Sequence, residues 1–543
     1  MISAFVLFGA LLPIKGLYFY TALYPQWGKW AYATYALASF LFPGWELQQS
    51  GIGGPHIGPG ALAIQQWEAF LLFTAVCIII FLLYILAVYR LPAIVSRRYI
   101  IYSTLFIGLT GILIPMLTSQ DILSYIIYAR MEAIYHVNPL TATPNALRHD
   151  ILYEYIYWKN QPSIYGPTWI IITGGLQWIL DLIGWGNPLI MVIFLRLLTL
   201  GAHLGSCLLI WSIGEHLQPS TDKQDQRRKR AMLAFAWNPL LLLEASINAH
   251  NDTFVLFFIL LGCWFLMRPS SSVIRSQVYA TIMFALATSI KINIVLLMPG
   301  FFLYLWTQRQ WLRSTAITLT VYIVTVLALY APFWQNGAAL NVLSINPGTN
   351  LNINTMAEFS ADFLNGIVHL LIGRTLTIFG QITHTASIII FVFIYGLLCL
   401  RTMYRQHRLY TPLHFIRFSA LVWFLYCALG APWFWPWYTI TFFGLFALLE
   451  ATQEFPWQAR TFLGALTIPR ATRLFTIGVF GIYLFGAQPL ASFMPDFFPM
   501  RWAYFRGLWT WIVPLSVLSL YVWSTRQRWR QWLLGIKRVI WPI

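Results

Sequence analysis

Long apolar stretches, separated by short polar or basic segments, recur along the whole 543-residue chain. A helix needs about 20 mostly apolar residues to cross the hydrocarbon core of a bilayer. The stretches that approach or reach this length are 3–24, 27–42, 66–89, 99–117, 166–184, 188–213, 231–248, 252–267, 278–305, 314–335, 383–401, 412–430, 436–450, 472–490 and 505–524. Some are short or interrupted, so the pattern predicts an all-α polytopic membrane bundle with about 12 to 14 transmembrane helices.

The composition agrees with a chain embedded in lipid. Hydrophobic residues make up 59% of the chain and charged residues only 9%, whereas about a quarter of the residues in a soluble domain are charged. No long polar stretch remains for a separate soluble domain. We therefore predict a single integral membrane domain over 1–543, with N-terminal segments at 1–98, a central core at 99–440, and C-terminal segments with a basic tail at 441–543.

The net charge of +17 comes largely from short loops between apolar segments. Basic residues hold such loops on the cytoplasmic side of a membrane, so the charge is no sign of nucleic-acid binding. We expect 90–98, 222–230, 401–408 and 526–538 to lie inside. The helix that follows 90–98 then carries the chain to the outer face, where the loop 118–164 begins.

Two features of this outer region carry further expectations. In the loop, Leu147, Ile151, Tyr155 and Trp158 recur at helical spacing, which predicts an amphipathic helix on the membrane surface. If both 166–184 and 188–213 crossed the membrane, the basic loop 222–230 would lie outside. Either 166–184 is therefore a re-entrant or interfacial helix, or another segment is miscounted.

The sequence also excludes several functional classes. All five cysteines lie in apolar segments, and their spacing suggests neither a zinc site nor a disulfide framework. Phosphate-binding loops of the Walker type, dinucleotide fingerprints and zinc-protease motifs are absent from the sequence. We therefore expect no soluble nucleotide ligand and no cofactor, and the sequence indicates no metal.

Asp121 stands where the chain leaves the apolar segment 99–117. An acid at a membrane boundary is costly unless it faces water, a partner or a cavity. One interpretation is that Asp121 caps the helix that follows it. The other is that its carboxylate has a catalytic role, and the two interpretations are compatible.

A second polar group, His250, Asn251 and Asp252, separates two apolar segments within 237–254. It is either an ordinary turn in which Asp252 caps the next helix, or a contact for a sugar or phosphate. By loop charge it lies on the same face as Asp121. Glu244, within the preceding apolar run, should be paired or face a cavity.

Lys291 interrupts the long apolar stretch 278–305, and Pro299 follows it. A broken helix lining a cavity fits this pattern, because irregular backbone at membrane depth needs water or protein around it. A cation there can neutralise a phosphate on a lipid. Arg130 and Arg196 are further phosphate candidates, because guanidinium binds phosphate through two hydrogen bonds.

Aromatic residues beside prolines and glycines mark two more segments, "QPSIYGPTW" (161–169) and "GAPWFWPWYT" (430–439). Tryptophan and tyrosine are common in the interfacial belts of membrane proteins. Aromatic rings also stack on sugars, so Tyr165, Trp435 and Tyr438 are candidate sugar-binding residues.

The order of these motifs over 99–440 resembles the C superfamily of membrane glycosyltransferases. It is most similar to the bacterial polyprenyl-phosphate-mannose-dependent α-mannosyltransferases. The motifs are Asp121 with "SYIIYAR", Asn138-Pro139, Trp158, "YGP" at 165–167, a helix with Arg196, "WNPLLLLEASINAHND", "SIKINIVLLMP" and "PWFWPWY".

The resemblance implies an inverting transferase, with the catalytic part at 99–440. Such an enzyme moves a hexose, which the resemblance implies is mannose, from a polyprenyl-phosphate donor to a glycan or glycolipid acceptor. Asp121 would be the catalytic base, with Lys291, Arg130 and Arg196 at the donor phosphate, and the active site would face outside the bacterial plasma membrane. The sugar and acceptor contacts implied are His250, Asn251, Asp252, Tyr165, Trp435 and Tyr438.

This sequence departs from the family pattern in two places. Leu140 stands where an aromatic residue is expected after Asn138-Pro139, and no second acid accompanies Asp121. The second departure argues against a bound metal. A transporter or flippase for a lipid-linked glycan remains the alternative, and a non-catalytic membrane scaffold is a third possibility.

Overall fold

A computed structural model gives the fold of the greater part of the chain. It describes residues 49–50, 54–55, 59–112, 119, 121–217, 221–268, 272–307, 310–343, 352–406, 411–452, 469–486 and 506–516. The predicted membrane segments 3–24 and 27–42 lie outside the described residues, as does the basic segment 526–538. The predicted total of 12 to 14 crossings includes such segments and stays a prediction.

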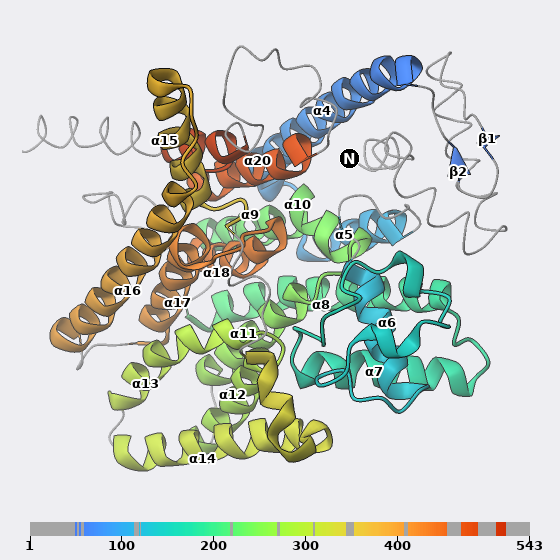
Figure 1. Cartoon of the computed structure of the whole chain (residues 1–543). Helices are drawn as coiled ribbons and strands as arrows, with labels where there is room; N and C mark the ends of the chain where they lie inside the picture. The colour runs from blue at the N-terminus through green and yellow to red at the C-terminus, as the bar shows by residue number, and fades with distance from the viewer. Residues whose placement is uncertain are drawn as a thin grey trace, which may run out of the picture.

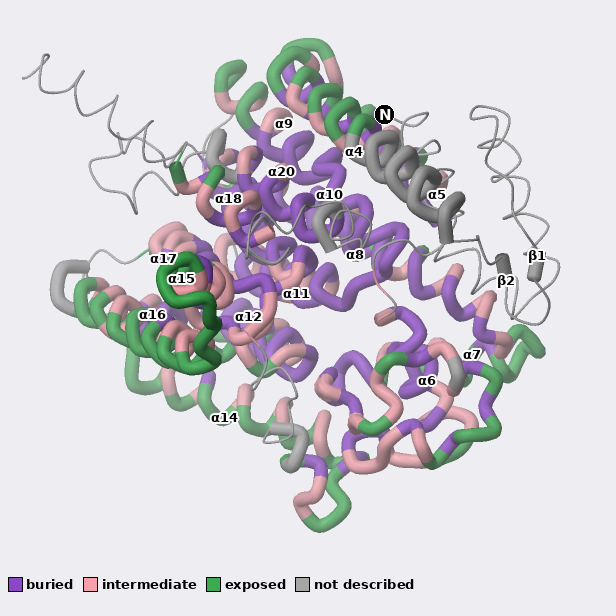
Figure 2. Tube along the Cα trace, turned by 45° about the horizontal axis from the view of Figure 1, so that its top comes forward, coloured by how far each residue is buried: buried purple, intermediate pink, exposed green. Residues whose placement is uncertain are grey.

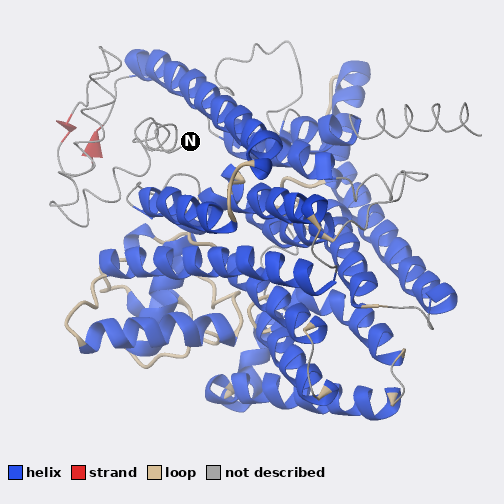
Figure 3. Ribbon diagram, turned by 180° about the vertical axis from the view of Figure 1, so that it is seen from behind, coloured by secondary structure: helices blue, strands red, loops and turns tan. Residues whose placement is uncertain are grey.

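The described residues are almost entirely helical (Figure 3), as the apolar pattern predicts. The helices that run from the first described segment to the basic loop are α4 (Pro59–Arg90), η1 (Leu91–Ala93), α5 (Arg97–Ile112), α6 (Asp121–Ala133), η2 (Pro144–Leu147), η3 (Tyr153–Tyr155), α7 (Pro167–Leu182), α8 (Pro188–Leu217) and α9 (Asp222–Ala236). The described strands are β1 (Gln49–Ser50) and β2 (Gly54–Pro55), which pair antiparallel.

The second half of the described chain is also helical. Its helices are α10 (Pro239–Leu242), η4 (Leu243–Ile247), α11 (Asp252–Met267), α12 (Val273–Thr288), η5 (Ile292–Leu297), α13 (Met298–Trp306), α14 (Trp311–Tyr330), η6 (Ala331–Phe333), η7 (Gln335–Leu343), α15 (Met356–Ile372), α16 (Ile378–Gln406), α17 (Pro412–Leu425), η9 (Tyr426–Gly430), η10 (Pro436–Tyr438), α18 (Thr439–Ala451), α20 (Pro469–Gly486) and η12 (Leu508–Ile512).

Five helical segments of the described chain are long and apolar enough to cross a membrane: Ala75–Ala93, Pro188–Leu217, Trp311–Phe333, Ile378–Met403 and Pro412–Gly430. A sixth is possible if one bent pair of helices counts as a single crossing. Helices α8, α11 and α18 are largely buried at the centre of the bundle, whereas α14 and α16 expose most of their surface (Figure 2). Their exposed side chains are mainly isoleucine, leucine, valine and phenylalanine, as expected of a surface that faces lipid.

Two membrane helices are broken, and both breaks fall where the sequence places polar residues in an apolar run. Pro239–Ile247 and Asp252–Met267 meet at an angle of 110°. Helix α12 ends at Thr288, Lys291 is extended, and the chain continues through a short 3-10 helix into α13. The broken helix predicted around Lys291 is therefore confirmed.

The outer loop folds differently from its prediction. Instead of one amphipathic helix over Leu147–Trp158, it forms two short 3-10 helices, η2 and η3. The carboxylate of Asp150 interrupts the turn between them, because it accepts hydrogen bonds from the Leu152 N–H, from Arg130 and from Tyr135. The longest helix of the loop is instead α6, which is largely buried and packs against α7. Both helices lie below α8 in the view of Figure 1.

Helix α7 bears on the conflict in the predicted topology. Its 16 residues span about 24 Å, which is short of the roughly 30 Å of a hydrocarbon core. It is also absent from the helices of the described chain that could cross a membrane. This favours the interfacial or re-entrant interpretation of 166–184.

The basic segments 90–98 and 222–230 lie on the same side of the bundle. Helix η1 packs against α9. The guanidinium groups of Arg97 and Arg228 lie 5.6 and 5.4 Å from the ring centre of Trp211. Helix α5 begins at this basic side, and Asp121 follows its other end along the chain.

A labelling experiment tests this two-sided arrangement. We expect a cysteine at Arg148 and a cysteine at Lys223 to react with a membrane-impermeant maleimide from opposite sides of the membrane, in a chain whose native cysteines are replaced by alanine. Both positions are exposed, so access depends on sidedness. Labelling in intact cells and in inverted vesicles is the measurement. Reaction of both cysteines from one side contradicts the arrangement.

Candidate active site

Asp121 is the first residue of α6, and its side chain is 21% exposed. Among the described residues its carboxylate accepts one hydrogen bond, from the Tyr165 hydroxyl at 3.2 Å. It makes no capping bond to a described backbone N–H, so capping does not account for this acid. The carboxylate is partly open and retains free lone pairs with which it can accept a proton.

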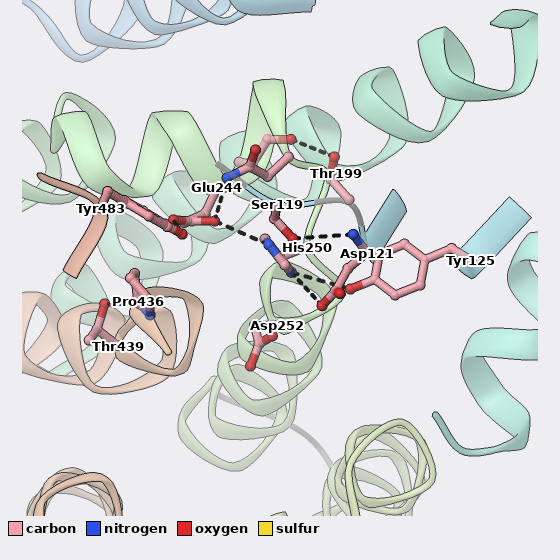
Figure 4. Close-up of polar contacts among 12 residues, drawn as sticks. Ser119, Asp121, Tyr125, Thr199, Glu244, His250, Asp252, Pro436, Thr439 and Tyr483 are labelled. Atoms are coloured by element: carbon pink, nitrogen blue, oxygen red, sulfur yellow. Dashed lines mark hydrogen bonds and ion pairs between the residues drawn. The ribbon is translucent and has the colours of Figure 1, made fainter. Parts of the chain in front are cut away.

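The imidazole of His250 lies between two carboxylates (Figure 4). Its Nδ1 is 3.9 Å from Asp121 Oδ2 and 3.3 Å from the Tyr125 hydroxyl. Its Nε2 is 3.4 Å from Glu244 Oε2. Both His250 and Glu244 are fully buried, and Nε2 makes no hydrogen bond to the described residues despite this short distance.

Glu244 is paired, as the sequence requires of a carboxylate in an apolar run. Its Oε1 accepts a hydrogen bond from the Tyr483 hydroxyl at 2.5 Å, and its Oε2 accepts one from the Asn248 amide at 3.0 Å. A continuous line of polar contacts therefore runs from Asp121 through His250 and Glu244 to Tyr483.

The break between η4 and α11 positions His250. Ala249, directly before it, has a φ of +54°, a conformation that costs a non-glycine residue about 1 to 3 kcal/mol. The His250 N–H donates to the Glu244 carbonyl at 2.9 Å, which closes the turn. The imidazole also stacks on Trp437, with ring centres 3.9 Å apart and planes 15° apart. The ring is thus fixed from its backbone and from one face.

Lys291 and Asp252 connect the two broken helices. The Lys291 ammonium donates to Asp252 Oδ2 at 2.7 Å, and it lies 4.5 Å from the ring centre of Tyr438. The Asp252 side chain is 1% exposed, but that of Lys291 is 13% exposed. An ammonium has three donors, so Lys291 keeps donors for a ligand while its charge is partly balanced.

The segment around Gly166 satisfies the backbone at the second break. The Gly166 and Thr168 N–H groups donate to the carbonyls of Ile290 and Ser289, at 3.0 and 3.2 Å. A Cβ on Gly166 would lie 2.2 Å from the Ser289 carbonyl oxygen, so this approach requires glycine. The contact places Tyr165, which bonds to Asp121, beside the break that carries Lys291.

Burial and nearby charges set the basicity of Asp121. Desolvation is the largest effect and raises the pKa of Asp121 to about 6. The positive charge of Lys291 and the hydrogen bond from Tyr165 lower this pKa, and the negative charge of Asp252 raises it. A carboxylate with a pKa near 6 is ionised at neutral pH and is a stronger base than a solvated aspartate.

The structure brings together six of the predicted site residues: Asp121, Tyr165, His250, Asp252, Lys291 and Tyr438. Asn251 lies in the same turn and is fully buried, and neither end of its amide has a hydrogen-bond partner among the described residues. Trp435 stacks on Trp437, with ring centres 5.1 Å apart, and so extends the face on which His250 lies.

Two predicted phosphate ligands lie away from this group. Arg130 is nine residues from Asp121 along α6, which is about 13 Å, and it is paired with Asp150 at 2.8 Å. Arg196 is buried in α8 and donates to the Ile112 carbonyl at 2.7 Å. Both therefore support the fold around the site in this structure, and Lys291 is the predicted cation that lies beside Asp121.

Three residues of the site are not among those predicted from the sequence. Tyr125 lies one helical turn after Asp121, a spacing that could have identified it, because residues four apart share a helix face. Trp437 lies two residues from Trp435, within a motif that was recognised. Tyr483 comes from α20, far along the chain, and no local signal connects it to Glu244.

The described part of the chain contains no group of three or more histidine, cysteine, aspartate or glutamate side chains able to hold a metal ion. Asp121, His250 and Lys291 offer a carboxylate base, an imidazole and an ammonium.

A mostly apolar cavity of about 670 Å³ lies near the site, between α16, α17 and η9. Arg401 is the one charged residue in its lining. The lining includes Ala428 and Leu429 of η9. In the same short helix, the Tyr426 hydroxyl accepts a hydrogen bond from Asn293 at 3.0 Å. Helix η9 therefore contributes both to the cavity lining and to a contact with Asn293, two residues after Lys291.

Comparison with known proteins gives one family. Residues 28–308, more than half of the chain, match the family described as alpha-(1->6)-mannopyranosyltransferase, N-terminal domain. No curated protein and no solved structure shows a significant match.

Proposed function

The chain belongs to the alpha-(1->6)-mannopyranosyltransferase family, and on this premise we propose that it transfers mannose from a polyprenyl-phosphate donor to a glycan or glycolipid with inversion. The resemblance found in the sequence is thereby confirmed at the level of a membrane mannosyltransferase. The proposal adds a polyprenyl-phosphate donor, inversion at the anomeric carbon and an active site on the outer face of the membrane.

The observation that carries the proposal is the placement of Asp121 beside Lys291. The two residues come from distant segments, yet Tyr165, which donates to the Asp121 carboxylate, is followed by Gly166, whose N–H donates to the carbonyl of Ile290, next to Lys291. A base and a phosphate-binding cation are the two groups that this reaction requires. Tyr165 and Asp252 hold them in place.

The donor side of the site is suited to a phosphate attached to a lipid. Lys291 offers its remaining N–H donors at the end of a broken membrane helix. The apolar cavity that η9 helps to line has room for part of an isoprenoid chain. An apolar cavity suits an isoprenoid chain and offers a nucleotide few polar partners.

The reaction then proceeds by direct displacement. An acceptor hydroxyl oxygen attacks the anomeric carbon, and its proton passes to Asp121 as the new carbon–oxygen bond forms. The bond from the anomeric carbon to the phosphate oxygen breaks, and polyprenyl phosphate leaves with the electron pair. Lys291 stabilises the charge that grows on this phosphate. Attack from the opposite face converts a β-linked donor into an α-mannoside.

His250 has a supporting role in this scheme. With its Nδ1 toward Asp121 and the Tyr125 hydroxyl and its Nε2 toward Glu244, it is a positioning residue beside the base. Glu244 would balance the charge of a protonated imidazole, which the buried surroundings disfavour by themselves.

Replacement of Asp121 tests the assignment of the base. We expect Asp121→Asn to lower kcat at least about 100-fold, which is the lower range for loss of a general base. The measurement is mannosyl transfer from purified polyprenyl-phosphate mannose to mannan oligosaccharides by the protein in detergent or liposomes. Asp181→Asn, an exposed acid on α7, is the matched control and should keep wild-type activity.

Full activity of Asp121→Asn, with a thermal unfolding temperature equal to that of the wild type, would overturn the base assignment. Absence of transfer by the wild type from every lipid-linked donor would favour a transporter for a lipid-linked glycan instead.

The pH profile gives an independent test. Because Asp121 must be ionised to accept a proton, and its pKa is raised to about 6, we expect kcat/KM to fall as the pH drops through about 6. Below that pH the fall should approach tenfold per unit. The assay covers pH 5 to 8, with protein pre-incubated at each pH and returned to pH 7 to confirm that it stays folded. A flat profile down to pH 5 contradicts the role of Asp121.

A further inference from the structure

A row of aromatic rings extends from the active site toward the outer loop. Trp437, which stacks on His250, is followed by Trp435 at 5.1 Å between ring centres and by Trp433 at a further 5.9 Å. The row crosses to the outer loop at Trp158, 5.4 Å from Trp433, and continues to Tyr157 at 4.8 Å.

The environment of the rings changes along this row. Trp437 is buried, whereas Trp435, Trp433 and Trp158 are partly exposed. Tyr157 is 73% exposed. The row therefore begins in the protein interior beside His250 and ends at solvent.

Two hydrogen-bond donors in the row have no partner. The indole N–H groups of Trp433 and Trp435 are both shielded from solvent, and neither makes a hydrogen bond to the part of the chain that the structure describes. A buried donor without a partner is costly, so these groups call for a ligand with oxygen acceptors. Their own rings supply flat apolar faces beside them.

The inner part of the row is held in a fixed conformation. Ile353 exchanges backbone hydrogen bonds with the segment that carries the tryptophans, donating to the Pro432 carbonyl and accepting from the Phe434 N–H. The Asn354 amide donates to the Phe434 carbonyl at 2.9 Å. Little ordering is then needed when a ligand binds, which favours binding.

We propose that Trp437, Trp435, Trp433, Trp158 and Tyr157 form an acceptor track that binds a linear chain of several hexose units. The outer rings would bind units remote from the reacting hydroxyl. This inference rests on the proposed transferase function and deepens it, because it names the residues that hold the part of the acceptor remote from the reacting hydroxyl.

Sugar chemistry matches the acceptor track better than lipid does. A pyranose has an apolar C–H face that lies on an aromatic ring and hydroxyl oxygens that accept hydrogen bonds. Aromatic residues of an interfacial belt instead lie at the headgroup level of the bilayer. The acceptor track starts at a buried histidine beside the predicted base, a position with no role for a belt residue.

Acceptor length is the variable that tests the acceptor track. We expect the wild type to show a kcat/KM about fivefold higher for each added unit, from an α-1,6-linked mannose disaccharide to a tetrasaccharide, which corresponds to roughly 1 kcal/mol per unit. Trp158→Ala should lower the ratio of the tetrasaccharide to the disaccharide at least about fivefold, since the loss of one stacking contact removes about that amount.

Two further variants complete the design. Trp433→Phe keeps a ring but removes the indole N–H, and it should lower the same ratio. Trp178→Ala removes an exposed tryptophan of α7 that is 57% exposed and lies outside the acceptor track, so it should keep the wild-type ratio.

The outcomes separate this inference from the proposed function. A wild type that transfers mannose with no dependence on acceptor length overturns the acceptor track and leaves the transferase intact. An unchanged ratio of the tetrasaccharide to the disaccharide in both Trp158→Ala and Trp433→Phe also overturns the acceptor track. An equal fall of this ratio in Trp158→Ala and Trp178→Ala overturns it as well, because these rings would then be interfacial anchors. Absence of any transfer overturns the transferase itself.

Discussion

The ion pair between Lys291 and Asp252 is the interaction on which the rest of the site depends. Either charge alone, between apolar helices, would be expensive. Together, at 2.7 Å, they compensate each other and join two helices at the points where both are broken. The breaks in turn expose backbone groups that the segment after Tyr165 satisfies. One charge pair thus connects irregular backbone, a bound loop and the position of Asp121.

Features with a local physical cause were predictable from the sequence. Lys291 and the His250–Asp252 turn interrupt apolar runs, and interruption of such a run requires a break, a partner or a cavity. The basic segments 90–98 and 222–230 lie on the same side of the bundle, as their charge predicts. The family followed from the order of these features along the chain rather than from any single motif.

The features that could not be predicted from the sequence depend on contacts between distant segments. The periodicity of 147–158 predicted a surface helix, but Asp150 is bound to Arg130 and shapes the loop into two short turns. Through the same contact, Arg130, which was predicted to bind the donor phosphate, is paired with Asp150. Tyr483 reaches Glu244 across 239 positions, and no spacing in the sequence indicates such a partner. Charged residues in a membrane protein can thus be located from sequence, while their partners emerge only from the fold.

In the proposed reaction, Asp121 and Lys291 catalyse mannosyl transfer from a lipid-linked donor with inversion. The most direct measurement is a comparison of donors with the purified protein, β-linked polyprenyl-phosphate mannose against a water-soluble nucleotide mannose, with the new linkage identified by NMR. We expect transfer from the lipid donor alone and an α-1,6-mannoside as the product. Equal use of the nucleotide donor, or a β-linked product, would contradict it.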